Sequence, residues 1–368
     1  MIQRAHKIKL KPNKAQATML AKTAGTARYA YNWGLARWKE LYEQGAQCSA
    51  YALISSWKNE RPDWALEVGA ACLQRPFMHL EGAFKAFFRK QNAYPVFKCK
   101  GVHDGFYIPN THFKVHGSKI QLPKLGRVRM MESLRYNDCK IVSAAVHKDA
   151  DGWYATITVE LDSERRSEAT SVVGIDVGCT TYAAASDATI CSKPARLAGL
   201  ERQLKRRQRL LARKAKGSRN RGKARNKVAR TYQKITNIKQ DAIHKFTAAI
   251  AKNHGTAVLE TLDIKSMKEG DNKHVRKGVQ NSAMSEIHRQ LRYKCNNFIA
   301  VDRYFKSSQL CSVCQNVHAE LSLSDRTYLC PSCGHTMDRD SNAAMNLLVE
   351  GIRIITAGQA GSASGDSR

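Results

Sequence analysis

Two Cys-x-x-Cys pairs near the carboxyl end constrain this chain more than any other feature. Cys311 and Cys314 form the first pair, and Cys330 and Cys333 form the second, within Cys-Pro-Ser-Cys-Gly. Each pair is expected on a tight turn that directs both sulfurs at one tetrahedral centre, which is typical of a structural zinc site. The alternative is four buried thiols beside a solvated acidic turn. Because two correctly spaced pairs rarely arise by chance, the pattern favours zinc.

Acidic residues follow the second cysteine pair. Asp338 and Asp340 precede the sequence Ser-Asn-Ala-Ala-Met-Asn, and a short apolar helix is expected over 342–350. A structural zinc would therefore fix where a carboxylate stands at the start of that helix.

The charge of the chain narrows the class of partner. Its 368 residues include 61 Lys and Arg against 31 Asp and Glu, a formal net charge of +30. A compact protein with this charge repels itself unless a polyanion neutralises it. Nucleic acid is the first candidate partner, and an anionic membrane surface is the second.

The compartment is expected to be intracellular. No apolar run approaches the roughly 18 residues of a spanning helix, and the N-terminus lacks a signal-peptide core. The cysteines outside the two pairs are scattered without a pattern, which indicates reduced thiols in a reducing compartment. They are Cys48, Cys72, Cys99, Cys139, Cys179, Cys191 and Cys295.

The first half of the chain is predicted to be a small β-barrel with a helical insertion. A strand at 5–10 ends at Pro12-Asn13, which also caps the first helix. The predicted helices are 14–23, 26–44 (with a break near Gly25), 50–58 and 67–90. The predicted barrel strands are 113–115, 120–122, 128–131, 140–146 and 153–161. These patterns place the barrel at 1–12 and 93–165 and the helical insertion at 13–92.

One helix of the insertion carries an aromatic stripe and several cations. The stripe favours a core over a platform for ligands, and its members are Tyr31, Leu35, Trp38 and Tyr42. Arg28, with Arg37 and Lys39, lies off this stripe and is a candidate phosphate contact.

A second domain is expected to open at Val172. The run Val-Val-Gly-Ile-Asp-Val-Gly is a buried strand with Asp176 near its end, and a return strand follows at 182–186. Residues 256–262 form a second buried strand that contains Glu260. A helix at 284–299 and a strand at 304–309 lead into the zinc module. Residues 353–368 predict a disordered tail.

A basic helical hairpin, 197–252, is expected between these two strands. From Arg202 to Lys239 it contains 16 Lys or Arg and no acid. A solvated helix face normally mixes both signs of charge, so the run favours nucleic-acid contact over a plain solvated surface. The candidate contacts are Lys205, Arg206, Arg207, Arg213, Lys214, Arg219 and Arg221.

Three carboxylates stand in settings that suggest a cation site. Asp176 and Glu260 are flanked by aliphatic strand residues, and Asp340 precedes a helix. A lone carboxylate in an apolar strand is costly unless it is paired, hydrogen-bonded or bound to metal. Carboxylate oxygens are preferred ligands of Mg²⁺ and Mn²⁺, and two such ions can support phosphodiester hydrolysis. Ordinary turn or ladder carboxylates are the alternative.

At this point the sequence resembles the TnpB family of transposon-encoded RNA-guided DNA endonucleases, which are related to type V CRISPR effectors. The resemblance covers about the first 350 residues. Its motifs are Lys-Leu-Lys-Pro-Asn-Lys-Ala-Gln near the N-terminus, Tyr-Pro-Val-Phe-Lys (94–98), Leu-Pro-Lys-Leu-Gly (122–126), Gly-Ile-Asp-Val-Gly (174–178), Leu-Glu-Thr-Leu (259–262), Ser-Ser-Gln-Leu-Cys (307–311) and the cysteine pairs with Asp-Arg-Asp-Ser-Asn-Ala-Ala-Met-Asn.

The resemblance implies a multidomain α/β fold with a β-barrel. It implies a RuvC-like nuclease of RNase H fold at 171–307 and 341–352, with an inserted zinc module at 308–340 that contacts the target strand. The N-terminal barrel would correspond to a wedge domain and the helical insertion to a recognition domain. Together these would hold a guide RNA and read a short motif beside the target.

The resemblance also assigns site residues. Asp176, Glu260 and Asp340 match the catalytic, metal-binding acids, with Asp338 as the runner-up for the third. Gln74 and Asn110 match by position the residues that contact the flanking motif. Pro109 stands where other members carry a polar residue, which predicts a different flanking motif. Cys179-Thr180-Thr181 also departs from the commoner residues after the first acid.

The sequence and the resemblance together predict an RNA-guided, Mg²⁺-dependent endonuclease that cuts double-stranded DNA, with one structural zinc and a guide RNA. It is expected to act as a single protein copy in a ribonucleoprotein, in the cytoplasm of a prokaryote near the nucleoid. The rivals are a guided repressor without cleavage, a transposase that breaks and joins strands directly, and a zinc-containing RNA-binding protein. The three intact acids favour the enzyme over the repressor.

Overall fold

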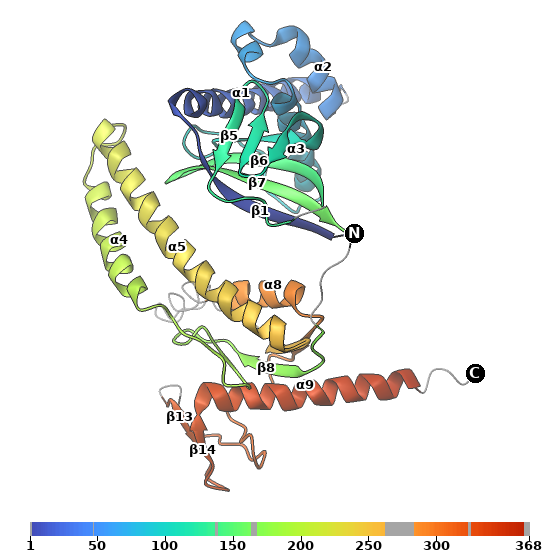
Figure 1. Ribbon diagram of the computed structural model, residues 1–368, viewed down its shortest axis with the longest axis vertical. Helices are drawn as coiled ribbons and strands as arrows, with labels where there is room; N and C mark the ends of the chain where they lie inside the picture. The colour runs from blue at the N-terminus through green and yellow to red at the C-terminus, as the bar shows by residue number, and fades with distance from the viewer. Residues whose placement is uncertain are drawn as a thin grey trace. The chain divides into compact units, whose positions relative to one another are not determined.

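The computed structural model describes residues 2–46, 48–136, 139–162, 168–261, 283–322 and 325–363. The chain divides into two compact units, Met1–Glu164 and Arg165–Arg368, and each is described by itself. Figure 1 shows the elements of both units along the chain. Among the described residues, no helix is long and apolar enough to cross a membrane.

The first unit is built on a seven-stranded antiparallel sheet. Its order is β2-β6-β7-β1-β5-β4-β3. The strands are β1 (Ile2–Lys11), β2 (Gly105–Pro109), β3 (Lys114–His116), β4 (Lys119–Leu122), β5 (Gly126–Met130), β6 (Lys140–Asp149) and β7 (Gly152–Leu161). Buried and less buried residues alternate along β7, as expected for a strand with one face on a core. The hairpin between β6 and β7 joins Asp149 to Gly152.

This sheet is open, so the predicted closed barrel is wrong. Within the described residues, the edge strands β2 and β3 are not paired with each other. They follow one another along the chain, separated by a short 3-10 turn, Asn110–His112. Pro109 ends β2 and has no N–H to donate to a further ladder. Strand β1 joins the two halves of the sheet, because Ile2–Lys9 pair with β7 while Leu10 and Lys11 pair with β5.

The unit also has three α-helices, α1 (Lys14–Glu43), α2 (Ala50–Glu60) and α3 (Ala71–Phe88), with a 3-10 turn at Asp63–Glu67. Helices α1 and α3 pack on the sheet, and α2 packs on those two helices. The predicted cap at Asn13 is confirmed, because its side chain accepts from the Gln16 N–H at 2.8 Å and Gln16 reciprocates. The break predicted near Gly25 is wrong, since α1 is continuous. Ala24 and Ala27 are buried in the sheet core on either side of Gly25, and this packing outweighs the roughly 1 kcal/mol propensity cost of a helical glycine.

The aromatic stripe of α1 lies in a separate helical core, as predicted. Tyr31, Leu35 and Trp38 are buried among residues of α2 and α3, and the Trp38 ring stacks on Phe84 with 4.6 Å between centroids. Tyr42 is the exception, because 64% of it is exposed.

The second unit contains a five-stranded mixed sheet of order β10-β9-β8-β11-β12. The strands are β8 (Val172–Asp176), β9 (Ala183–Ala185), β10 (Ile190–Cys191), β11 (Thr256–Glu260) and β12 (Asn297–Val301). Strands β8, β11 and β12 are parallel, while β9 and β10 run antiparallel. Helices α4 (Arg196–Ala212), α5 (Arg219–Asn253) and α8 (Met284–Lys294) share one core with the sheet. Helix α9 (Arg339–Ala363) lies along the opposite face of β8 (Figure 1).

Three boundaries of this unit differ from the sequence prediction. The helix predicted at 284–299 ends at Lys294, and β12 pairs in parallel with β11 directly after it. Residues 304–309 form turns, not a strand. The tail predicted from 353 onward begins as helix, because α9 continues to Ala363.

Candidate active site and zinc centre

Two of the predicted acids end neighbouring parallel strands. Asp176 is the last residue of β8, and Glu260 is the last residue of β11. The register pairs Ile175 with Leu259, so the next residue of each strand is the acid. Parallel strands lie about 4.8 Å apart, and residues in one row of a sheet point to the same face. The sheet therefore brings Asp176 and Glu260 together at its carboxyl edge.

The third acid arrives on helix α9, which lies unusually close to the sheet. A Cβ added to Gly174 of β8 would stand 2.1 Å from the Ala344 carbonyl oxygen, and one added to Gly351 of α9 would stand 2.4 Å from Val258 of β11. Glycine at these two positions lets the helix rest directly on both strands. The start of α9, with Asp340, then falls at the end of β8.

The electrostatics of Asp176 indicate that the three acids are close. The pKa of Asp176 is raised to about 7, mainly by burial and further by the negative charges of Asp340 and Glu260. Burial also raises the pKa of Glu260 to about 7. Carboxylates placed together in a desolvated site favour a shared proton or a bound cation, so this group fits a hard divalent ion.

Asp338 and Asp340, which spacing alone did not separate, have different surroundings. The Asp338 carboxylate accepts from the Ser341 N–H at 3.0 Å and from its hydroxyl at 3.2 Å, so it caps α9. The pKa of Asp340 is raised by burial and by Asp338, while a hydrogen bond from Thr181 opposes that rise. The charge of Asp340 acts on Asp176, whereas Asp338 caps the start of α9.

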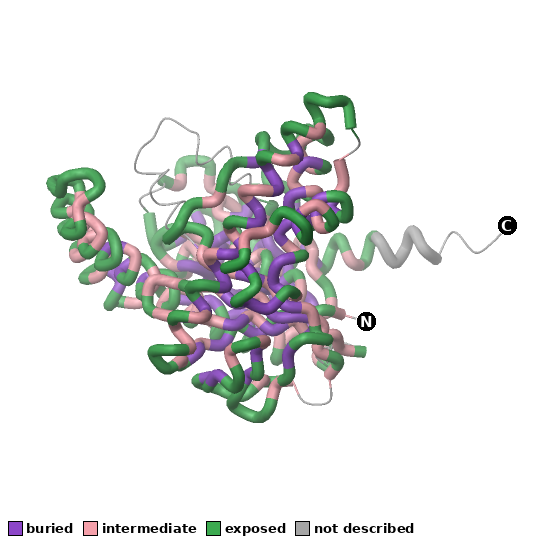
Figure 2. The backbone as a smooth tube through the Cα atoms, turned by 90° about the horizontal axis from the view of Figure 1, so that it is seen from above, coloured by how far each residue is buried: buried purple, intermediate pink, exposed green. Residues whose placement is uncertain are grey.

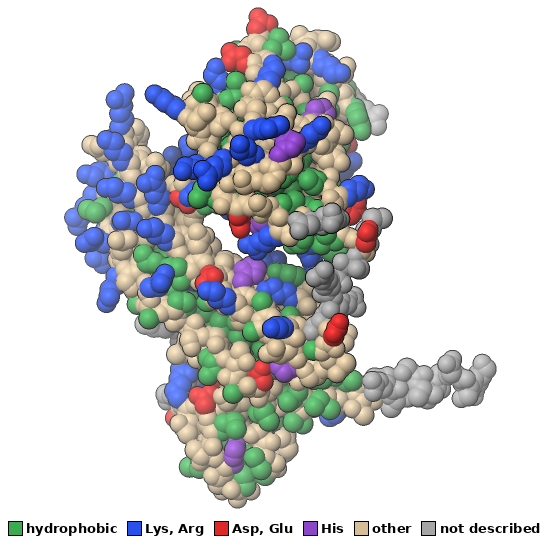
Figure 3. All heavy atoms as spheres, viewed as in Figure 1, with side chains coloured by type: hydrophobic (Ala, Val, Ile, Leu, Met, Phe, Trp, Pro, Cys, Tyr) green, Lys and Arg blue, Asp and Glu red, His purple; other side chains and the backbone are tan. Residues whose placement is uncertain are grey.

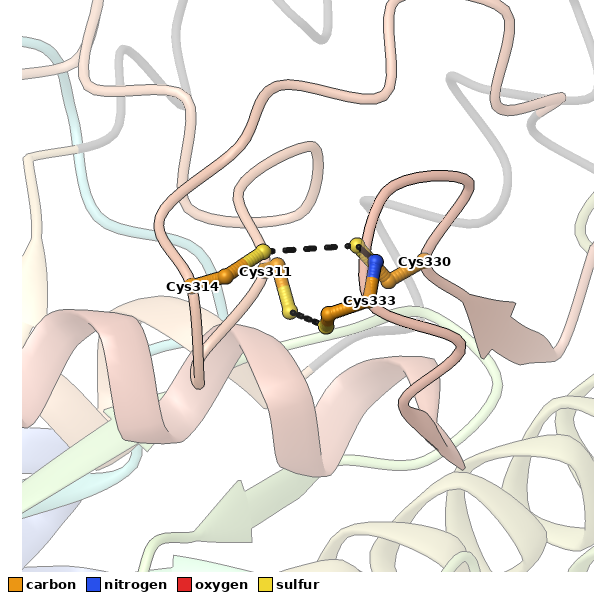
Figure 4. A group of neighbouring side chains, drawn as sticks. All are labelled: Cys311, Cys314, Cys330 and Cys333. Carbon is orange, nitrogen blue, oxygen red and sulfur yellow. Dashed lines mark hydrogen bonds between the residues drawn. The ribbon is translucent and has the colours of Figure 1, made fainter.

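The four predicted zinc ligands converge (Figure 4). The Sγ atoms of Cys311 and Cys333 are 3.7 Å apart, and those of Cys314 and Cys330 are 3.5 Å apart. All four sulfurs lie within 4.8 Å of one another. A tetrahedral site with Zn–S bonds of about 2.3 Å requires sulfurs about 3.8 Å apart, so the thiols fit zinc.

Two buried asparagines join the zinc loop to α9. Asn342 donates to the Leu310 carbonyl at 2.6 Å and accepts from the Ser312 N–H at 3.0 Å. Asn346 donates to the carbonyls of Ser307 and Leu310, both at 2.8 Å. These bonds fix the loop that bears Cys311 against the helix that bears Asp340. Sequence reasoning missed this role, although the four-residue spacing of the two asparagines on an apolar helix was a usable signal.

The basic hairpin is formed by α4 and α5, and its candidate contacts fall into two groups. Arg207 donates to Thr231 Oγ1 and to the Lys227 carbonyl, and Arg221 donates to the Leu211 and Lys214 carbonyls. These two arginines hold the hairpin together. The exposed candidates are Lys205, Arg206, Arg213, Lys214 and Arg219.

The exposed cations of the hairpin form a surface feature. Figure 2 shows the hairpin tip, at the left of the view, as mostly exposed, and Figure 3 shows Lys and Arg side chains gathered over α4 and α5. Such a stripe has the charge of a nucleic-acid contact.

The candidate contacts of the first unit also differ in setting. Arg28 pairs with Asp104 at 2.6 Å, and both side chains are largely buried, so Arg28 serves the fold. Gln74 is exposed on α3, and Asn110 is exposed in the turn after β2.

Comparison with protein families gives three matches. Residues 156–271 match a family described as "Probable transposase", and residues 285–347 match the Cas12f1-like TNB domain. Residues 1–47 match a family described as a helix-turn-helix domain, although in this chain the segment holds β1 and one continuous helix.

Similar proteins cover nearly the whole chain. One is the "Putative RNA-guided DNA endonuclease InsQ" of Escherichia coli, 32% identical over 96% of this chain and 94% of its own length. A second, from Streptomyces pristinaespiralis, is a "Putative RNA-guided DNA endonuclease", 31% identical over 99% of this chain and 92% of its own length. Among solved structures, a Cas12f1–sgRNA–target DNA complex matches with a TM-score of 0.56 and 15% identity, over 91% of this chain and 83% of that one, which shows a shared fold.

Proposed function

This chain belongs to the TnpB family of transposon-associated RNA-guided DNA endonucleases. We propose that Asp176, Glu260 and Asp340 bind the divalent metal with which it cuts DNA. The observation that carries the assignment is the strand register that ends neighbouring parallel strands in Asp176 and Glu260, and the raised pKa of Asp176 agrees with it. A carboxylate buried beside two others is costly to ionise without a cation, so the site is suited to holding one.

The three acids have separate tasks in this proposal. Asp176 and Glu260, fixed by one row of the sheet, would hold the metal from one side, and Asp340 would hold it from the start of α9. Bound Mg²⁺ or Mn²⁺, as a pair of ions, would activate water and stabilise the leaving oxygen. The Thr181 hydroxyl orients Asp340 and favours its ionised form, which is the form that binds metal.

The zinc centre is proposed to be structural. Cys311, Cys314, Cys330 and Cys333 would fill all four positions of one Zn²⁺ ion and leave none for water or substrate. Its task would be to rigidify the loop that Asn342 and Asn346 attach to α9, and so to keep Asp340 in place.

The remaining parts are proposed to bind nucleic acid. The first unit would act as wedge (1–12 and 93–165) and recognition insertion (13–92), with Gln74 and Asn110 available for the flanking motif. The RuvC-like part (171–307 and 341–352), of RNase H type, would receive single-stranded DNA, and 308–340 would contact the target strand. The α4–α5 cations would bind backbone phosphates.

Guide RNA is proposed to supply sequence recognition by base pairing. The complex would contain one protein copy and act at the nucleoid of a prokaryotic cell, since the relatives reported above are bacterial.

One experiment tests the function as a whole. The protein is purified, its copurifying RNA is sequenced, and cleavage of a randomised-flank DNA library that contains the guide-matched target is measured. We expect cutting that requires both the RNA and Mg²⁺ and that stops with a chelator. Cutting without RNA would favour the transposase, and RNA-dependent binding without cutting would favour the repressor.

A further inference from the structure

A cavity of about 370 Å³ lies within the first unit, among α1, α3, β2, β6 and the segment 98–105. It is lined by basic and aromatic groups that no part of the proposed cleavage site uses. Gln74 and Asn110, the residues matched to the flanking motif, are not among its lining residues. The cavity is therefore separate from that proposed contact.

The cavity carries more positive than negative charge. Its two acids already have cationic partners: Asp104 pairs with Arg28 at 2.6 Å, and Asp149 pairs with Lys7 at 2.6 Å. Within the described part of the chain, no carboxylate lies within ion-pair distance of Arg75, Lys98 or Lys148, which also line the cavity. Three cations thus share a concave site whose two carboxylates are paired with other cations.

Lys98 is held in place and partly removed from water. Its ammonium lies 3.8 Å from the centroid of the Tyr31 ring, and burial lowers its pKa. Its backbone is fixed by Asn32, which accepts from the Lys98 N–H at 2.8 Å and donates to its carbonyl at 3.0 Å. A partly desolvated ammonium that is held in place destabilises the fold unless an anion binds to it.

Arg75 adds a second fixed donor. Its guanidinium lies over the Tyr107 ring at 4.5 Å, and its Nε donates to His79 Nε2 at 3.3 Å. Its Nη1 contacts Met78 Sδ at 4.0 Å, and no hydrogen bond from Nη2 is seen among the described residues. Planar guanidinium groups bind phosphate oxygens in pairs.

We propose that this cavity binds one phosphodiester of the guide RNA, with Lys98 and Arg75 as the donors. The volume admits a single nucleotide unit, and the fixed cations match the charge of its phosphate. A resident RNA suits the site better than a transient DNA target, because the desolvated Lys98 needs a partner throughout the life of the complex. The assignment of the bound anion to guide RNA rests on the proposed function. The assignment of an anion site to this cavity does not.

The test compares Lys98→Met with a matched surface change, Lys58→Met on α2, in the full-length chain. The probe is a labelled transcript of the RNA that copurifies with the wild-type protein. We expect Lys98→Met to weaken RNA binding about tenfold or more and to lower the slope of log affinity against log salt by about 0.7, the value for one lost phosphate contact on a single strand. Lys58→Met should change affinity less than twofold. Phosphate-ethylation interference should identify one phosphate whose modification harms wild-type binding and not Lys98→Met binding.

Melting in the absence of RNA separates a binding role from a structural one. Lys98→Met should melt at the wild-type temperature or above, because it removes a partly desolvated charge that has no carboxylate partner and keeps a side chain of similar length. A lower melting temperature with unchanged RNA affinity would overturn the proposal in favour of a packing role. Unchanged RNA affinity with weaker binding of target DNA by the loaded complex would overturn the assignment to RNA. Neither result depends on cleavage, so failure of the proposed nuclease activity would be seen separately.

Discussion

Gly174 of β8 and Ala344 of α9 approach so closely that a methyl group on the glycine would stand 2.1 Å from the alanine carbonyl oxygen. This contact lies two residues before Asp176 and one helical turn after Asp340. The distance between the first and third acids therefore depends on a backbone approach that only glycine permits.

Gly174→Ala should displace α9 from the sheet. Because the added Cβ meets backbone, not a movable side chain, we expect a loss of about 3 kcal/mol or more in the free energy of unfolding, with cleavage reduced at least as much as stability. Gly199→Ala is the matched control. Nothing lies within 4 Å of its added Cβ, and alanine stabilises a helix interior by about 1 kcal/mol. Denaturant unfolding and a cleavage assay measure both variants, and a Gly174→Ala protein with wild-type stability would contradict the packing argument.

Asp340→Asn and Asp338→Asn should separate the two neighbouring acids. We expect Asp340→Asn to reduce cleavage below about one thousandth of the wild-type rate while RNA binding persists, because a metal ligand is lost. Asp338→Asn should keep the helix cap, since asparagine caps as well as aspartate, and should retain most activity and stability. If Asp338→Asn lowers the single-turnover cleavage rate more than Asp340→Asn does, Asp338 and not Asp340 is the metal ligand.

The acids should give the metal-free protein a distinctive dependence on pH. The folded-state pKa of Asp176 is about 7, above its value of about 4 in an unfolded chain, so the unfolded state releases this proton first as pH rises. Asp176 therefore destabilises the fold progressively between about pH 4 and pH 7. Asp176→Asn removes this effect and should be more stable than wild type by on the order of 2 kcal/mol at pH 8, with little difference at pH 4.

Mg²⁺ should oppose this loss in the wild type. We expect the ion to raise the melting temperature more at pH 8 than at pH 5, because it competes with protons for the carboxylates, and to have little effect on Asp176→Asn. Differential scanning fluorimetry over this pH range, with and without Mg²⁺, provides the measurement. An equal Mg²⁺ effect on both proteins would place the ion elsewhere.

The site residues could be predicted from the sequence because each is unusual in its local surroundings. Asp176 and Glu260 interrupt aliphatic strands, and the cysteine pairs have a spacing that chance rarely produces. Their convergence was not readable, since it depends on the close approach at Gly174. The choice between Asp338 and Asp340 likewise required the hydrogen bond that makes Asp338 a cap.

The misjudged fold elements share a cause in tertiary packing. Helix α1 runs through Gly25 because apolar neighbours on both sides are buried against the sheet. Strand β12 follows α8 without a turn signal, and only its parallel pairing with β11 defines it as a strand. The ion pair of Arg28 with Asp104 was likewise not predicted, because Asp104 is remote in sequence. Local patterns do not contain such partners.

Cys311→Ser should remove zinc and destabilise the second unit. We expect the zinc content to fall from about one ion per chain to a small fraction, with a lower melting temperature and weakened cleavage, because the loop that Asn342 attaches to α9 loses its centre. Cys99→Ser is the control, since this thiol is exposed and lies outside the cluster. Elemental analysis of the purified proteins measures the zinc content per chain. Full zinc content in Cys311→Ser would refute the four-thiolate site.

Asn342→Ala should separate zinc binding from catalysis. The cysteines are untouched, so zinc content should stay near that of the wild type. The Ser312 N–H would lose its acceptor, and leaving such a group unpaired costs about 1–3 kcal/mol. The Leu310 carbonyl would lose one of its two donors and keep the one from Asn346. With the loop no longer attached at this point, α9 can shift, and the rate of single-turnover cleavage should fall by about tenfold or more while RNA binding is unchanged. Asn342→Ser, which keeps a polar group, should recover part of that rate. A zinc-loaded Asn342→Ala protein that cuts at the wild-type rate would show that the position of Asp340 is set by the Gly174 contact alone.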